Sequence, residues 1–297
     1  MFIIKLDLFE TKLIKILREK IWKICLERTL SAVKTKSIIP FETELIKIED
    51  LNLVYELRKL KGKKQKKKRI IGPIKNPFLP WEKELEIINV NKNHTLILNK
   101  YPVEIGHMLL ITNEWKPQNG WLDITDWESL TNIENDTCGL WFFNNSQNAG
   151  ASQPHRHLQL LRRKLNTKFF PREKFFSDFN ECYENNFLYN SCKVLPRNEF
   201  RKDYSAQELN DLYLELCLSM NIGNPSDCEK PLCSYNLIIT DKFISIIRRN
   251  KESYKGFSIN ALGFAGYLLI TEFSDLEWLI SNKPNNLLSN VVSPIKN

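Results

Sequence analysis

The chain has 297 residues, of which 42% are hydrophobic and 11% aromatic, which is enough for a substantial core and for about two domains at roughly 150 residues each. Its longest apolar stretches, such as 262–270, are far shorter than the roughly 20 residues of a membrane-spanning helix, and acidic residues interrupt the first 23 positions, so we expect neither a membrane segment nor a secretory signal. Seven scattered cysteines without a CxxC pair argue against a disulfide framework and a four-cysteine zinc site, and we predict a cytoplasmic location.

The formal net charge is +8, and much of the excess lies in one run, Lys61 to Arg69 (KGKKQKKKR). Blocks of like charge are usually solvated loops. Two other interpretations stay open: a loop that faces a polyphosphate, and a patch that binds nucleic acid.

The amino-terminal third is predicted to contain one helix and one hairpin. Apolar residues recur at helical spacing over 8–30, which indicates a helix packed on the body of the protein. Prolines punctuate 72–81 and exclude a regular helix there. The segments 94–99 and 107–112 are typical of two strands joined by a turn.

In the middle of the chain, Thr125 and Glu128 have the spacing of a capping box and predict a helix over 126–136. Strands are predicted over 140–143 and 154–161, with a turn region between them.

The remainder begins with a segment of mixed character, 162–201, which we interpret as a linking region that contains the domain boundary near residue 180. The elements expected after it are a helix capped by Ser205 and Glu208, strands over 235–240 and 243–248, and a final helix capped by Ser274 and Glu277.

Two of the four histidines, His155 and His157, form an H-x-H-x-Q series with Gln159. Residues two apart on a strand point to the same face, so these polar side chains are expected to share one surface while Leu158 and Leu160 face the core. Histidines that merely satisfy core hydrogen bonds are the alternative. Polar groups on a core strand are costly to bury without partners, which favours a functional role.

A small polar segment, 144–153 (NNSQNAGASQ), leads into the histidine strand. Gly150 permits a close backbone approach, and the amides of Ala151, Ser152 and Gln153 are expected to form an anion-binding nest. A neutral imidazole is a good nucleophile at phosphorus if its other ring nitrogen donates to a fixed acceptor, typically a backbone carbonyl. No carboxylate or cysteine lies in the strand, so we expect no metal ligation.

The string GASQPHRHLQL, Gly150 to Leu160, resembles the signature of the diadenosine tetraphosphate phosphorylases, also called ATP adenylyltransferases, in the histidine-triad superfamily. The resemblance covers most of the chain through further segments: 39–50, 76–81, 94–115, 235–240 and 258–266. It implies an α+β fold, with a histidine-triad-like antiparallel sheet and flanking helices in a catalytic domain over 1–180 and a C-terminal α+β portion over 181–297.

The resemblance further implies phosphorolysis of diadenosine tetraphosphate by inorganic phosphate to ATP and ADP through an adenylyl-histidine. His157 would be the nucleophile, and Gln159 would hydrogen-bond the α-phosphate, since the transferases have glutamine where hydrolases have histidine. His155 would support the loop and the phosphate oxygens. No tightly bound cofactor is expected, and Mg²⁺ would arrive with the nucleotide.

Substrate contacts carry over from the family to a set of polar, small and basic residues: Lys63, Asn76, Pro77, Asn144, Gly150, Ala151, Ser152, Gln153 and Asn236. For Lys63 and Asn236 a purely structural role is an equal alternative. The family's F-x-V-R pattern is replaced here by VYELR, ending at Arg58, which leaves the register of that segment open. Arg248 and Arg249 end a strand and would either meet terminal phosphates or be solvated.

Other functions compete with this one. A sugar-nucleotide uridylyltransferase or an adenylylsulfate phosphorylase would use the same covalent chemistry. A catalytically silent nucleotide or RNA binder would use the basic run, but such a binder needs no aligned nucleophile, so the intact histidine series makes nucleic acid the less favoured partner.

Overall fold

The computed structural model describes residues 20–51, 53–61, 76, 78–137, 139–162, 170–179, 187–198 and 204–295. Its centre is an eight-stranded sheet in which every neighbouring pair is antiparallel. The strand order is β3 (Glu86–Asn89), β4 (His94–Leu98), β5 (Met108–Thr112), β7 (His157–Leu161), β6 (Leu140–Asn144), β9 (Ser234–Ile239), β10 (Phe243–Arg249) and β8 (Cys192–Pro196). The predicted α+β class with an antiparallel sheet is therefore confirmed.

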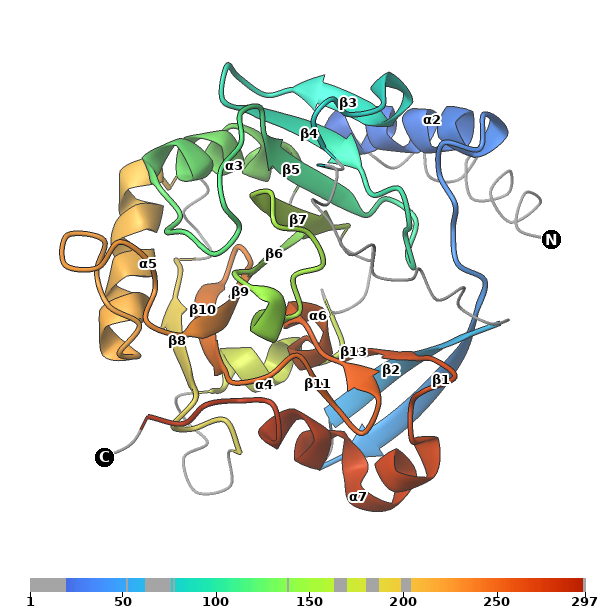
Figure 1. Ribbon diagram of the computed structural model, residues 1–297, viewed down its shortest axis with the longest axis vertical. Helices are drawn as coiled ribbons and strands as arrows, with labels where there is room; N and C mark the ends of the chain where they lie inside the picture. Colours follow the sequence, from blue (N-terminus) through green and yellow to red (C-terminus); the bar gives the residue numbers. More distant parts are fainter. Residues whose placement is uncertain are drawn as a thin grey trace.

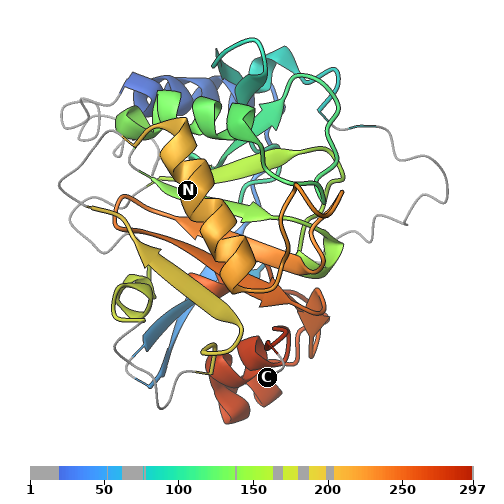
Figure 2. The ribbon, with the colours of Figure 1, turned by 90° about the vertical axis from the view of Figure 1, so that its left-hand side faces the viewer.

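Three helices cover one face of this sheet: α2 (Lys20–Lys34), α3 (Ile124–Thr137) and α5 (Ala206–Ser219). Helices α3 and α5 pack on each other over the sheet, and α2 packs beside α3 (Figure 2). Strand β6 illustrates why two cores form, because successive side chains on a strand point to opposite faces. Trp141 and Phe143 join the core under these helices, whereas Leu140 and Phe142 join a second core on the other face.

A smaller, three-stranded sheet packs on that second face (Figure 1). In it the hairpin of β1 (Thr43–Asp50) and β2 (Leu53–Leu60) pairs through β2 with the parallel strand β13 (Tyr267–Ile270). The remaining elements are the helix α7 (Leu276–Ser289) and six short ones: η1 (Lys83–Leu85), η2 (Gln147–Ala149), α4 (Glu173–Ser177), β11 (Ser253–Tyr254), β12 (Phe257–Ser258) and α6 (Ala261–Phe264). The histidine strand β7 thus lies in the middle of the large sheet, and one of its faces looks toward the small sheet.

Most predicted elements are confirmed. The hairpin over 94–112, the helix over 126–136 and the strands over 140–143, 235–240 and 243–248 are all present, with ends that shift by one or two residues. The predicted helix over 8–30 is observed from Lys20 onward, and residues 1–19 lie outside the described residues.

Two helix caps differ from prediction. The capping box of Ser205 and Glu208 is confirmed. At α3, however, Asp123 accepts the N–H of Thr125, so the helix begins before the predicted Thr125 and Glu128 pair. At α7 the cap is Asp275, whose carboxylate accepts the N–H of Trp278. In both cases an aspartate near the predicted cap competes successfully for the free amides of the first turn.

The predicted linking region, 162–201, holds two regular elements, α4 and the edge strand β8. The predicted strand over 154–161 begins only at His157, and His155 forms an isolated bridge with Pro117. The predicted boundary at residues 180 and 181 lies outside the described residues, but β6 pairs directly with β9, so one sheet draws strands from both predicted portions. Within the described ranges no helix is long and apolar enough to cross a membrane.

Candidate active site

His157 begins strand β7 and is buried, with 3% of its surface exposed. Its Nδ1–H donates to the carbonyl oxygen of His155 at 2.8 Å, as the sequence predicted for a nucleophilic imidazole. A neutral ring with its proton on Nδ1 has a lone pair on Nε2. Burial lowers the pKa of His157 to about 4, because a charged imidazolium is poorly solvated there. The side chain is therefore a neutral imidazole with an unprotonated Nε2 at physiological pH.

His155 lies just before β7 and is held at both ring nitrogens. Its Nε2–H donates to the carbonyl of Thr112 at 2.9 Å, and its Nδ1 lies 2.9 Å from Nδ2 of Asn76. The N–H of Phe78 donates to Oδ1 of Asn76 at 3.0 Å, which turns the amide group of Asn76 toward His155. These bonds fix the backbone whose carbonyl receives the Nδ1 proton of His157.

Two buried side chains that the sequence analysis did not select hold β7 in place. Gln118 accepts the N–H of His157 at 2.8 Å and donates to the carbonyl of Asn144 at 2.7 Å, so it ties the histidine strand to the loop after β6. Arg156 donates to Asp126 at 3.0 Å on the opposite face, and Asp126 also bonds His94 at 2.9 Å. The sequence did hold a signal for Arg156: it is a charged residue at a position of the motif that faces the core, where charged residues are rare unless paired.

Gln159 lies two residues beyond His157 on the same strand and is 8% exposed. Its Oε1 is 3.0 Å from Nε2 of His107, whose Nδ1 is in turn 3.1 Å from Nδ2 of Asn99. His107 precedes β5, and burial lowers its pKa to about 4. His107 is a site residue that the motif analysis missed, because it lies 52 residues from Gln159 in the sequence.

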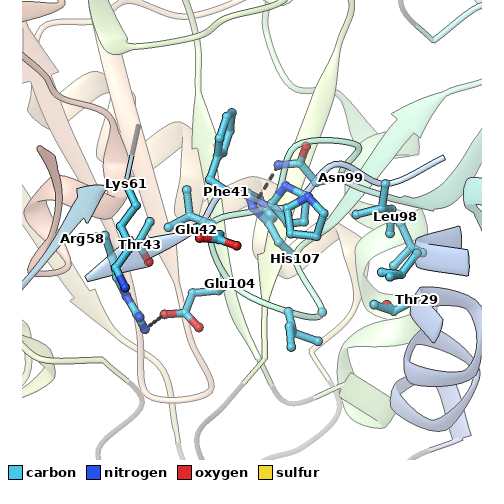
Figure 3. A pocket seen from close by; sticks show the side chains of 17 residues that line it. Thr29, Phe41, Glu42, Thr43, Arg58, Lys61, Leu98, Asn99, Glu104 and His107 are labelled. Atoms are coloured by element: carbon cyan, nitrogen blue, oxygen red, sulfur yellow. Dashed lines mark hydrogen bonds and ion pairs between the residues drawn. The ribbon is translucent and has the colours of Figure 1, made fainter. Parts of the chain in front are cut away.

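A cavity of about 330 Å³ opens beside this group. Figure 3 shows Asn99 and His107 between two walls, with Thr43, Arg58 and Lys61 on one side and Thr29 and Leu98 on the other. Arg58 forms an ion pair with Glu104. Arg58 lies on β2 and lines the cavity, which answers the question of register that the sequence left open for this segment.

The loop between β6 and β7 depends on Gly150, which has φ +84°. A Cβ there would lie 2.6 Å from the carbonyl oxygen of Ile259, so the close approach is to this neighbouring backbone. The amide of Ala151, expected in the anion nest, instead donates to the carbonyl of Ser146 at 2.9 Å. Within the described ranges the N–H groups of Ser152 and Gln153 have no hydrogen-bond partner, so these two remain as donors for an anion.

Asn144 and Asn236 support this loop from behind. Nδ2 of Asn236 donates to Oδ1 of Asn144 and to the carbonyl of Ala149, both at 2.8 Å, and Arg249 donates to Oδ1 of Asn236 at 2.6 Å. All three side chains are at most 2% exposed. Arg249 is therefore neither a solvated strand end nor a surface contact for phosphates, and Arg248 donates to the carbonyl of Met220. Substrate contact by Asn144 and Asn236 stays a prediction.

Two predicted contacts, Lys63 and Pro77, lie outside the described residues, as does most of the basic run. The described part of the chain contains no group of three or more His, Cys, Asp or Glu side chains arranged to hold a metal ion.

Replacing Gly150 by alanine is expected to destabilise the loop and to lower the melting temperature by several degrees. The new Cβ would clash with the Ile259 backbone, and the positive φ costs roughly 1 kcal/mol for a residue with a side chain. Thermal unfolding followed by circular dichroism measures this effect. Ser152→Ala is the matched control, because its side chain is exposed and its N–H is kept. Equal melting temperatures for both variants would contradict the argument.

Comparison with known proteins gives two family matches that together span nearly all of the chain. The model of the Ap4A phosphorylase N-terminal domain matches residues 11–176, and that of the ATP adenylyltransferase C-terminal domain matches residues 171–294.

Two curated proteins of Saccharomyces cerevisiae are similar in sequence. Diadenosine 5',5'''-P1,P4-tetraphosphate phosphorylase 2 is 28% identical over 231 residues, which are 68% of this chain and 70% of the relative. Protein APA1 is 29% identical over 237 residues, which are 70% of this chain and 72% of the relative.

The fold is also similar to crystal structures of yeast Ap4A phosphorylase Apa2. The complex with AMP superposes with a TM-score of 0.75 at 23% identity, covering 95% of this chain and 100% of the other. The complex with Ap4A gives a TM-score of 0.73 at 22% identity with the same coverage.

Proposed function

The chain belongs to the Ap4A phosphorylase family, and on that premise we propose that it cleaves diadenosine tetraphosphate with inorganic phosphate into ATP and ADP. The observation that carries the proposal is the state of His157. The Nδ1 proton is donated to a backbone carbonyl, and burial keeps the ring neutral with a free lone pair on Nε2. A nucleotidyltransferase that works by double displacement needs such a nucleophile.

The reaction then proceeds in two displacements. In the first, the lone pair of His157 Nε2 attacks the α-phosphorus, a P–N bond forms, and the bond from that phosphorus to the bridging oxygen breaks, so ATP leaves. In the second, an oxygen of inorganic phosphate attacks the same phosphorus, the P–N bond breaks, and ADP leaves. In the intermediate the adenylylated imidazole carries positive charge, which the bond from Nδ1–H to His155 stabilises.

Negative charge that develops on the α-phosphate oxygens requires fixed donors. Gln159, two residues from His157 on the same strand face, would supply its side-chain NH₂ group. The free backbone N–H groups of Ser152 and Gln153 would supply two more donors from the loop that Gly150 shapes. His155 would act indirectly, since both of its ring nitrogens already have protein partners.

We propose that the cavity beside His107 receives one nucleoside of the substrate. Its volume of about 330 Å³ lies at the lower end of the range for small-molecule sites. Apolar side chains such as Val33, Ile38 and Leu98 suit a base, and the amide of Asn99 suits a ribose hydroxyl. Arg58 and Lys61 at one wall favour the polyphosphate.

Mg²⁺ is proposed to arrive bound to the polyphosphate, because Mg²⁺ commonly binds through substrate phosphates. Family membership favours dinucleoside polyphosphates over sugar nucleotides as substrates. The basic run at 61–69, on which an RNA-binding role would depend, lies largely outside the described residues, and such a role stays a prediction.

The test is incubation of the purified protein with diadenosine tetraphosphate and ³²P-labelled inorganic phosphate, followed by chromatographic separation of the nucleotides. Equal amounts of ATP and ADP are expected, with the label only in ADP, since the attacking phosphate becomes its β-phosphate. Product formation must also require phosphate. ATP plus AMP in the absence of phosphate would mean hydrolysis and would overturn the proposal.

The value of kcat/KM for diadenosine tetraphosphate is expected to be constant from about pH 8 to pH 5 and to fall below that range. The pKa of His157 is lowered to about 4 by burial, so the reactive neutral imidazole persists well below the ordinary histidine pKa of about 6.5. Rates measured in constant-ionic-strength buffers check this, with unfolding monitored at each pH. A single inflection near pH 6.5 would contradict it.

A further inference from the structure

An amide side chain can hold a phosphate oxygen only if its NH₂ group faces that oxygen. The two ends of a glutamine amide have nearly the same shape, so rotation by half a turn would present Oε1 to the phosphate instead. A lone pair facing a phosphate oxygen is repulsive. The usefulness of Gln159 therefore depends on whatever fixes the direction of its amide.

A chain of hydrogen bonds sets that direction, and it starts at a backbone group that can only donate. The N–H of Tyr101 donates to Oδ1 of Asn99 at 3.0 Å. Nδ2 of Asn99 is then directed to Nδ1 of His107, 3.1 Å away, which makes Nδ1 an acceptor and leaves the single ring proton on Nε2. Figure 3 shows the bond between Asn99 and His107 at the cavity.

The chain ends at Gln159. Nε2–H of His107 donates to Oε1 of Gln159 at 3.0 Å, so the NH₂ group of that amide is turned away from His107. Within the described part of the chain, Nε2 of Gln159 has no hydrogen-bond partner. We propose that Asn99 and His107 are positioning residues that hold the amide of Gln159 with its NH₂ group toward the α-phosphate.

The surrounding strands make the arrangement rigid. Leu109 on β5 pairs with Gln159 on β7, and the N–H of Asn99 bonds the carbonyl of His107 at 2.9 Å across the hairpin. His107 is 9% and Gln159 is 8% exposed, so little water can compete for the bond between them. Burial also lowers the pKa of His107 to about 4, and a neutral ring is required, because a doubly protonated ring would leave Nδ2 of Asn99 facing a second donor.

The inference rests on the proposed function, because it assigns the orientation of an amide used in that reaction. It also ties two parts of the site together. Asn99 and His107 line the cavity proposed for the nucleoside, so the groups that face the nucleoside also orient the donor for its phosphate.

The first experiment does not depend on whether the protein turns over a substrate. Long-range ¹H–¹⁵N correlation spectra of the uniformly labelled protein report which ring nitrogen of each histidine carries the proton, and His107→Gln assigns the signals of His107. The Nε2–H tautomer is expected for His107. An Nδ1–H tautomer would overturn the proposal. If the parent protein does not turn over diadenosine tetraphosphate, the proposed function fails, whereas this spectrum still decides the direction of the chain.

The second experiment is a double-mutant cycle on kcat with His107→Leu and Gln159→Leu. His107→Leu is expected to lower kcat roughly 10- to 100-fold, somewhat less than the usual loss of one fixed donor to a transition state. In the Gln159→Leu background the same substitution should change kcat less than about threefold, because its target is gone. Multiplicative effects of the two substitutions would overturn the proposal, since they would mean that His107 acts elsewhere.

Two conservative variants serve where leucine disturbs folding. His107→Gln places an N–H donor near the position of Nε2 and is expected to retain kcat within about fivefold of the parent. Asn99→Asp keeps the shape but offers only an acceptor to Nδ1, which moves the ring proton to Nδ1 and reverses the chain. Its kcat is expected to be low at pH 8 and to rise toward pH 6, as His107 gains a second proton beside the carboxylate. A profile parallel to that of the parent would overturn the proposal.

Discussion

Replacing His157 by asparagine is expected to lower kcat by at least about three orders of magnitude while the protein remains folded, because removal of a nucleophile eliminates the covalent route. Asparagine can still donate from Nδ2 to the carbonyl of His155, which is the bond that Nδ1–H of His157 makes. It has no counterpart of Nε2. The loss therefore falls on the chemical step and not on the local fold.

Two measurements check this result. Steady-state rates give kcat, and incubation with α-³²P-labelled diadenosine tetraphosphate without inorganic phosphate is expected to label the parent protein but not the variant. The gel must be run under alkaline conditions, since P–N bonds are labile in acid. Circular dichroism and thermal unfolding are the control for folding. A labelled His157→Asn variant would place the nucleophile elsewhere and contradict the assignment.

Sequence periodicity predicted part of the strand face of the candidate active site: His157 and Gln159 lie on β7, whereas His155 lies just before it. Leu158 and Leu160 are completely buried in the core under the helices, and His157 and Gln159 alternate with them on the strand. The bond from Nδ1 of His157 to a backbone carbonyl was also predictable, because a neutral nucleophile at this position needs a fixed tautomer. These features depend only on neighbours within the motif.

Features that depend on strand register were not predictable in the same way. His107 meets Gln159 because Leu109 pairs with Gln159 across β5 and β7, and no local pattern specifies that pairing. The cavity requires α2, β2 and the β4–β5 connection to converge. The hairpin of β1 and β2 was missed even though Ile46 and Ile48 alternate with charged residues, which is a strand signal.

The asparagines Asn144 and Asn236 show a different limit of sequence-based prediction, which is that of residue type. Asn144 and Asn236 were selected as substrate contacts, yet each is buried and hydrogen-bonded to the other and to backbone. The amide group is equally suited to a ligand and to a main-chain carbonyl, so the residue type alone cannot distinguish these roles. Burial and hydrogen-bond partners show that these side chains support the loop between β6 and β7, and substrate contact by either of them stays a prediction.

Arg249 bonds both Asn236 and the backbone beside the loop between β6 and β7. Replacing Arg249 by methionine is expected to lower the free energy of unfolding by about 3 kcal/mol or more. It is 2% exposed and donates to the carbonyls of Val291, Lys251 and Ile259 at 2.9 to 3.0 Å, besides its bond to Asn236. Methionine fills a similar space but leaves these buried oxygens without their donor. Unsatisfied buried acceptors of this kind cost about 1–3 kcal/mol each.

The same substitution is expected to reduce kcat/KM, because Arg249 fixes the backbone of Ile259, against which Gly150 packs. The carbonyl oxygen of Ile259 that Arg249 binds is the atom that leaves no room for a Cβ at residue 150. If Ile259 shifts, the loop that presents the N–H groups of Ser152 and Gln153 shifts with it.

Urea titrations measure the stability of the Arg249→Met variant, and steady-state rates measure its kcat/KM. Arg248→Met is the matched control, since Arg248 is only partly buried and donates to the single carbonyl of Met220. Equal urea midpoints for the two variants would show that the buried guanidinium does not support the loop.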